Sequence, residues 1–138
     1  MQEIVESFIR TANAFDVEAT LSLFAPDAVI DDVSVGDAFE GADGVRQYLE
    51  RFFVGYHTAT RLLSIEMLDD RTSDVRVDFT GDFGHEIGIL RIVINAAGLI
   101  ERIDADLEQR FHPDLFHQTP RLHRSRGRER LASRWPPV

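Results

Sequence analysis

The sequence has 138 residues, enough for one domain but too few for two, and its lack of cysteine excludes disulfides, thiolate nucleophiles and cysteine-ligated metal sites. The net charge of −9 is uneven, since residues 1–108 hold 22 acidic residues against 8 Arg, whereas residues 109–138 hold 7 Arg against 2 acidic residues. An acidic body of this kind repels nucleic acid and anionic membranes, so we expect neither as a partner.

The chain begins with an acidic, amphipathic segment rather than a basic segment and a long apolar run. This pattern predicts no signal peptide and no membrane span, and so a cytoplasmic protein. Apolar residues at helical spacing predict a first helix over residues 2–14. A second, short helix is expected to begin near Asp16, a good N-cap, and to end before Pro26.

Two short strands are expected next, over residues 28–33 and 37–40, on either side of Gly36. Residues 41–44, which include two glycines, then lead into a third helix. The apolar stripe of that helix consists of Val45, Tyr48, Leu49, Phe52 and Phe53.

From Thr58 the apolar period changes from that of a helix to that of a strand. Four long strands are predicted, over residues 58–68, 74–83, 86–95 and 99–108, with short connections between them. Short connections imply an antiparallel meander. Helices followed by a run of strands predict an α+β fold, with the helices on one face of a curved sheet.

Residues 109–138 form a separate Arg- and Pro-rich tail, appended to a domain of residues 1–108. The favoured interpretation is a solvated tail. A nucleic-acid patch, and a segment that folds back on an acidic surface of this chain or of a partner, are the alternatives.

The order of elements, together with residues 15–29, 39–45 and 98–103, resembles the nuclear transport factor 2-like superfamily. Within it the chain is similar to the SnoaL-like branch of polyketide cyclases and ketosteroid isomerases. The resemblance implies a cone-shaped, curved antiparallel sheet packed against three N-terminal helices, a cystatin-like α+β barrel with one pocket between helices and sheet. It specifies the fold well and the reaction poorly.

Asp32 is the main candidate for a catalytic residue. It follows an apolar stretch on a strand expected to border the pocket, and it falls where the resemblance to ketosteroid isomerases places a proton-shuttling carboxylate. Burial beside apolar side chains would raise its pKa and make it a usable base near neutral pH. The alternative is that Asp31 and Asp32 are both solvated at a strand end. Neighbouring strand residues face opposite sides, so at most one of them faces the pocket.

The rest of a ketosteroid isomerase site is missing from the sequence. Phe8 stands where those isomerases have a Tyr, and Leu90 stands where they have a protonated Asp. Because a dienolate oxygen would then lack an obvious donor, we do not expect steroid isomerisation of that type.

Arg76 and Asp78 resemble the Arg-x-Asp motif of limonene epoxide hydrolases. The second carboxylate of that triad falls on Ala105, however, and Ile30 replaces a water-positioning Tyr. The favoured interpretation is that Val77 and its apolar neighbours point inward and the charged residues point outward.

His57, at the end of the third helix, could pair with Asp32 as in related dehydratases and cyclases, or could satisfy a backbone carbonyl. Arg61 and Arg91 could clamp a ligand oxygen, or form salt bridges on the outer face of the sheet, which is the commoner outcome. No metal-ligand, phosphate-loop or dinucleotide motif is found, so we expect neither a metal nor a nucleotide cofactor.

We therefore expect a cofactor-free acid–base enzyme of the isomerase, cyclase or hydratase/dehydratase type, acting on a small apolar, oxygenated molecule of the polyketide or terpenoid kind. It is expected to form a homodimer through the sheet face. Asp32 would handle the proton, with His57 or Asp78 as its partner. A non-catalytic ligand-binding or dimerisation module and an epoxide hydrolase-like enzyme are the alternatives. The expected substrate-binding residues are Phe8, Tyr48, Phe52, Arg61, Arg76, Phe79 and Arg91.

Overall fold

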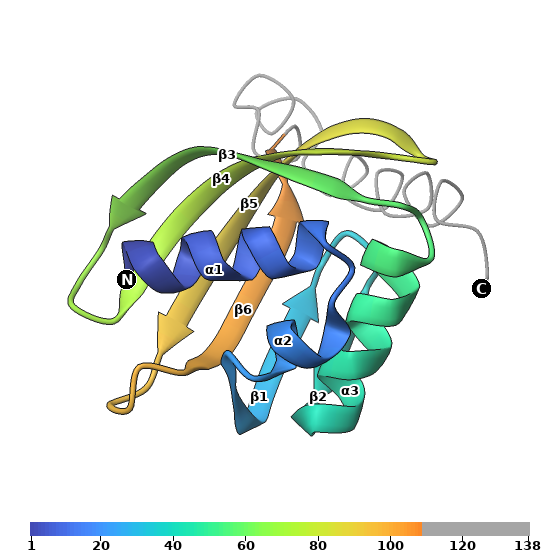
Figure 1. Cartoon of the computed structure of the whole chain (residues 1–138). Coiled ribbons are helices and arrows are strands. Elements are labelled where there is room, and N and C mark those ends of the chain that lie inside the picture. Colours follow the sequence, from blue (N-terminus) through green and yellow to red (C-terminus); the bar gives the residue numbers. More distant parts are fainter. Residues whose placement is uncertain (109–138) are drawn as a thin grey trace.

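The structure is a computed structural model that describes residues 1–108, so the predicted tail lies outside the described residues. Its helices and strands follow one another in the order predicted for an α+β fold (Figure 1). They are α1 (Gln2–Asn13), α2 (Val17–Leu21), β1 (Phe24–Asp32), β2 (Asp37–Glu40), α3 (Gly41–Tyr48), η1 (Leu49–Val54), β3 (Ala59–Met67), β4 (Thr72–Gly81), β5 (Gly84–Ile94) and β6 (Ile100–Leu107).

The strands form one curled, unclosed sheet in the order β2-β1-β6-β5-β4-β3. Strands β3 to β6 are the predicted antiparallel meander. In Figure 1, α1 crosses the concave side of this sheet and α3 lies beside β1 and β2. The predicted fold class is thereby confirmed.

One pairing in the sheet differs from a purely antiparallel arrangement, because β1 runs parallel to β6 and antiparallel to β2. The chain leaves β2 through α3 and η1 and re-enters the sheet at the far edge, in β3. The meander then leads back across the sheet, so that its last strand, β6, lies beside β1 and runs in the same direction as β1. This pairing places Asp32 opposite Ala105, near the end of β6.

The first two helices follow their sequence signals closely. The stripe of α1 is buried against the core, and the side chain of Asp16 caps α2 by accepting a hydrogen bond from the backbone N of Ala19 at 3.1 Å. Strand β1 begins earlier than predicted and includes Pro26. Its register against β6 is irregular between Phe24 and Val29, and proline is tolerated at such an irregularity because no ladder bond needs its missing N–H.

The third helix ends as a π-helix, η1, which the 3.6-residue period did not predict. Its wider turns are visible in two backbone bonds between residues five apart, from Gly55 N to Glu50 O at 2.9 Å and from Thr58 N to Phe53 O at 2.9 Å. A side chain at Gly55 would collide with the backbone oxygen of Arg51, so the absence of a Cβ permits this turn. Such segments are often found at functional sites.

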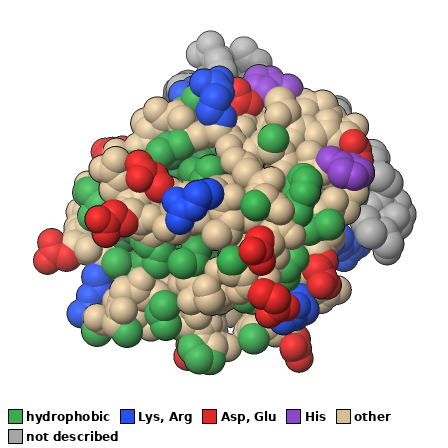
Figure 2. Space-filling model, in the orientation of Figure 1, with side chains coloured by type: hydrophobic (Ala, Val, Ile, Leu, Met, Phe, Trp, Pro, Cys, Tyr) green, Lys and Arg blue, Asp and Glu red, His purple; other side chains and the backbone are tan. Residues whose placement is uncertain are grey.

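The core lies between the helices and the concave face of the sheet and is rich in aromatic rings. Phe8, for example, packs edge-on against Phe24 and Phe53 with ring centroids 6.0 and 6.1 Å apart. On the helix-covered side, acidic side chains are spread over the surface with hydrophobic ones visible between them (Figure 2). Within residues 1–108 there is no helix with the length and apolar character needed to cross a membrane.

Candidate active site

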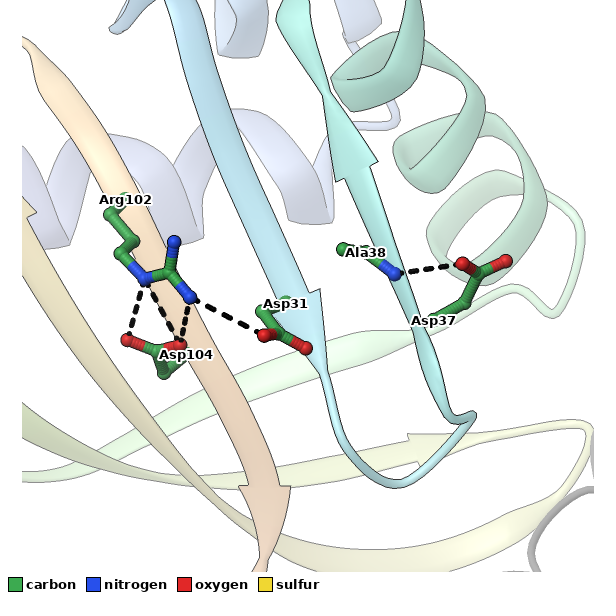
Figure 3. A network of polar contacts seen from close by, with 5 residues as sticks. All are labelled: Asp31, Asp37, Ala38, Arg102 and Asp104. Atoms are coloured by element: carbon green, nitrogen blue, oxygen red, sulfur yellow. Dashed lines mark hydrogen bonds and ion pairs between the residues drawn. The ribbon is translucent and has the colours of Figure 1, made fainter.

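Two adjacent acidic residues at the end of β1 face opposite sides of the sheet. Asp31 points to the outer face, where Arg102 reaches it at 3.3 Å and also binds Asp104 at 3.0 Å (Figure 3). Asp32 points to the concave face and is only 6% exposed. Strand alternation therefore separates a solvated ion pair from a buried carboxylate at consecutive positions.

Both oxygens of the Asp32 carboxyl group accept hydrogen bonds from inside the protein. Oδ1 accepts from the backbone N of Ser34 at 3.0 Å and from Ser34 Oγ at 2.6 Å. Oδ2 accepts from the hydroxyl of Tyr48, at the end of α3, at 2.5 Å. The turn after β1 brings Ser34 back onto the aspartate, in the way that Asp side chains commonly bond to backbone two residues ahead.

Burial is the largest influence on the ionisation of this pair. It raises the pKa of Asp32 above that of an ordinary aspartate, and the hydrogen bonds from Ser34 and Tyr48 only partly oppose this. Burial, together with the neighbouring Asp32 charge, also raises the pKa of Tyr48 well above that of a free tyrosine. Asp32 is therefore a stronger base than a solvated aspartate, and Tyr48 keeps its proton as a hydrogen-bond donor.

Asp32 and Tyr48 line a small pocket between η1 and the sheet. The pocket volume is about 30 Å³, room for little more than ordered water. A larger ligand can enter only if lining side chains move. The pocket is lined by Asp32, Ser34, Tyr48, Phe52, Phe53, Thr58, Phe79, Leu90, Ala105, Asp106 and Leu107.

Of the residues predicted to contact substrate, Tyr48, Phe52 and Phe79 line this pocket. Phe8 lies behind them, in the core against Phe24 and Phe53. Seven members of the lining were not named as site residues from the sequence, namely Ser34, Phe53, Thr58, Leu90, Ala105, Asp106 and Leu107. Only Ser34 carries a recognisable signal, the Asp-x-Ser spacing of a side chain that bonds to its own turn.

His57 does not form the predicted pair with Asp32. Its side chain is 72% exposed, and its Nδ1 lies 3.0 Å from Asp82 Oδ2 in the β4–β5 turn. The backbone of His57 adopts a left-handed conformation, with φ of 54°. It is the next residue, Thr58, that faces the pocket.

Asp78 and the three arginines predicted as ligand contacts lie on the outer face of the sheet. Asp78 pairs with Arg61 at 2.9 Å and with His85 at 2.5 Å. Arg91 pairs with Asp74 at 2.8 Å, and Arg76 pairs with Glu108.

The reason for this placement is the alternation along β4, which turns the fully buried Val75 and Val77 inward. The epoxide hydrolase-like arrangement of Arg76 and Asp78 is therefore not formed at the pocket. Among residues 1–108, no three His, Asp or Glu side chains are grouped so that they could hold a metal ion.

A family model described as a SnoaL-like domain matches residues 5–98, about two thirds of the chain. A search of curated proteins gives no significant match.

Several solved structures share the fold. The epoxide hydrolase/cyclase-like enzyme SalBIII, studied for pyran ring formation in the polyether salinomycin, is 21% identical with a TM-score of 0.68, over 77% of this chain and 88% of that chain. Rv0760c from Mycobacterium tuberculosis, in complex with estradiol-17β-hemisuccinate, is 19% identical with a TM-score of 0.68, over 75% and 90%. A computationally designed 17-OHP binder is 18% identical with a TM-score of 0.69, over 75% and 87%. At these identities the likeness shows the common fold.

Proposed function

This chain belongs to the SnoaL-like domain family, and we propose that it is a cofactor-free acid–base enzyme acting on a small, largely apolar, oxygenated molecule. Isomerisation, cyclisation, and hydration or dehydration are the reaction types that fit, because each needs a desolvated base in a shaped cavity. The observation that carries the proposal is the buried Asp32 carboxyl group, held in an aromatic pocket by Ser34 and Tyr48.

In this proposal Asp32 removes a proton from the substrate and returns it at another atom. Exclusion of water strengthens the base, because the ionised carboxylate has lost the solvation that would hold it in its charged form. The apolar lining, including Phe52 and Phe79, holds the carbon skeleton against the carboxyl group. The base is thus already in place when the substrate binds.

The similar structures support this class of ligand. One is of a cyclase-like enzyme of polyether formation, one of a complex with an estradiol derivative and one of a designed 17-OHP binder. We propose a polyketide- or terpenoid-like molecule for this chain. Since the pocket is only about 30 Å³, its binding requires the rings of Phe52, Phe53 or Phe79 to turn outward. The π-helical η1, which carries two of these rings, is suited to such an adjustment.

A non-catalytic ligand-binding module is the second candidate, and one observation favours it. Both oxygens of Asp32 are already bonded to protein donors, so the carboxyl group is satisfied without a substrate. In that case the pocket would capture a metabolite without changing it.

Deuterium exchange separates the two candidates without knowledge of the natural substrate. Cyclohexanone in D2O is the probe, and the loss of its α-proton signal is followed by NMR. The wild-type protein should accelerate exchange, and Asp32→Asn should lower the rate about 100-fold or more, while saturation-transfer NMR shows an affinity for cyclohexanone within a few-fold of wild type.

The matched control is Asp31→Asn, one residue earlier on the same strand but on the outer face. Arg102 keeps its contact with Asp104 in this variant, so stability changes little. Wild-type exchange in Asp31→Asn, with loss in Asp32→Asn, supports the enzyme. Equal exchange in all three proteins, with binding retained, favours the binding module.

We also propose a cytoplasmic homodimer formed through the outer sheet face. This face carries a groove of about 430 Å³, with charged side chains around an apolar floor. The groove is lined by Val33, Asp74, Ile89, Arg91, Asp104, Ala105 and Asp106. Light scattering should report a dimer for the wild type and a monomer for Ile89→Asp, which places a new charge in the middle of the groove.

A further inference from the structure

An enolising enzyme needs a hydrogen-bond donor for the oxygen that becomes negative, and most hydroxyls of the pocket are already engaged. The hydroxyls of Ser34 and Thr58 already donate, to Asp32 Oδ1 at 2.6 Å and to the Phe52 carbonyl at 2.6 Å. Among the described side chains that line the pocket, this leaves the Tyr48 hydroxyl as the candidate donor. It too is engaged, but with Asp32, the group whose charge changes during the reaction.

The two oxygens of Asp32 are bonded differently. Oδ1 accepts two hydrogen bonds from Ser34, which fills the acceptor capacity of a carboxylate oxygen. Oδ2 accepts from the Tyr48 hydroxyl, and the backbone N–H of Val35 also bonds to the carboxylate. Ser34 therefore anchors the carboxyl group, and Oδ2 is the oxygen that can take up a proton.

Resting on the proposed function, we propose that Tyr48 is the oxyanion donor of the reaction and that the proton taken up by Asp32 releases it. The substrate α-C–H bond breaks and its proton bonds to Oδ2. The electron pair of that bond forms the enolate C=C bond, and the carbonyl π pair moves onto the carbonyl oxygen. The new Oδ2–H donates to Tyr48 Oη, and the Tyr48 O–H turns from Asp32 to the enolate oxygen. Base and donor are thus one hydrogen-bonded pair.

The geometry selects a substrate class. Oδ2 and Tyr48 Oη are 2.5 Å apart. The α-carbon and the oxygen of one carbonyl group are also separated by about 2.4 Å, from the C–C and C=O bond lengths. One carbonyl compound can therefore present its α-C–H to Oδ2 and its own oxygen to Tyr48. The site is matched to ketones and aldehydes with an acidic α-hydrogen.

The test follows cyclohexanone exchange in D2O against pH for wild type, Asp32→Asn, Tyr48→Phe and Tyr56→Phe. Tyr56 is the other tyrosine of the chain, is buried, and does not line the pocket, so it is the matched control. Tyr48→Phe keeps the ring that packs on Phe39 and Phe52. Loss of its hydroxyl should move the midpoint of the pH profile upward and lower the high-pH plateau of kcat about 100-fold or more, with Tyr56→Phe unchanged.

Each outcome decides one point. A Tyr48→Phe profile with a shifted midpoint but a wild-type plateau means that Tyr48 only tunes Asp32, and the inference is overturned while the proposed function stands. Exchange that does not depend on Asp32 overturns the proposed function itself.

A binding measurement tests the same inference without turnover. In Asp32→Asn the amide can donate to Tyr48 Oη, so the Tyr48 O–H should already point into the pocket. This variant should bind 4-nitrophenolate, an enolate mimic, at least tenfold more tightly than wild type, and Asp32→Asn/Tyr48→Phe should lose that gain. Equal affinity of the single and double variants contradicts the role of Tyr48.

Discussion

Asn13, at the end of α1, is joined to Thr60 of β3 by two hydrogen bonds: its Nδ2 donates to the Thr60 carbonyl at 2.9 Å, and its Oδ1 accepts from Thr60 N at 2.7 Å. Strand β3 is an edge of the sheet. The side-chain amide therefore occupies backbone groups that an exposed edge would offer to another chain. It also holds the first helix across the concave face.

Asn13→Ala should destabilise the fold by about 1–3 kcal/mol, because it leaves two backbone groups of Thr60 without their partner. Urea unfolding measures the loss. Gln2→Ala, which removes an exposed amide bonded to Glu6, is the control and should stay within about 0.5 kcal/mol of wild type. An equal effect of both variants would show that the Asn13 contact does not hold α1 in place.

Asp32→Asn should stabilise the protein at neutral and alkaline pH. Because the pKa of Asp32 is raised on folding, the native state favours the protonated form. The contribution of Asp32 to the free energy of unfolding is fully present at pH values below its pKa in the unfolded chain. That contribution is lost as the pH rises through its pKa in the folded protein. The amide introduced by Asp32→Asn does not ionise, so the variant does not lose stability in this way as the pH rises.

Thermal unfolding at about pH 5 and about pH 8 checks this expectation. The gain in Tm of Asp32→Asn over wild type should be larger at the higher pH, and there it should exceed that of Asp31→Asn. A lower Tm for Asp32→Asn at both pH values would contradict the assignment of Asp32 as a destabilised buried acid. Activity and stability are expected to trade off at this residue.

Ser34→Ala should move the pH profile of Asp32-dependent exchange upward. The substitution removes the Oγ donor at 2.6 Å from Oδ1 but keeps the backbone N–H, so the ionised carboxylate loses part of its stabilisation and its pKa rises further. Ser22→Ala, at an exposed hydroxyl outside the pocket, is the control and should leave the profile unchanged. A profile of Ser34→Ala identical to that of wild type would show that the backbone bond alone anchors Asp32.

Gly88→Ala should block ligand binding without a large loss of fold. A Cβ at Gly88 would lie 2.5 Å from Phe79 Cε2, so the ring of this pocket residue must shift. Binding of cyclohexanone should weaken at least tenfold, at a stability cost of about 1–3 kcal/mol. The smaller side chain in Gly88→Ala/Phe79→Leu should restore binding. Failure of this rescue, with Gly88→Ala folded, would show that Phe79 is not the ring that limits access.

Local periodicity predicted most of the fold, because helices and strands in this chain follow their apolar patterns. The stripe of α1, the Asp16 cap and the β3–β6 meander all follow from residues close in sequence. The parallel β1–β6 pair and η1 were not predicted, since neither the strand partner nor the wider turn leaves a local pattern.

For the site, strand alternation predicted that at most one of Asp31 and Asp32 faces the pocket. The structure shows that the inward residue is Asp32, which is buried. The contact between Asp32 and Tyr48 joins residues 16 positions apart on different elements, so no sequence spacing predicts it. His57 was a reasonable candidate by position, but a left-handed backbone turns it toward Asp82. Such single-residue turns are poorly specified by composition.

The π-helical turn after α3 has a consequence for how this chain can change in length. Residues five apart are bonded there, so the turn holds one residue more than an α-helix would need. Deleting that residue would regularise the helix while rotating Phe52 or Phe53 out of the cavity wall. An insertion or deletion at this point would therefore reshape ligand specificity, at a cost in stability because both rings are buried in the core.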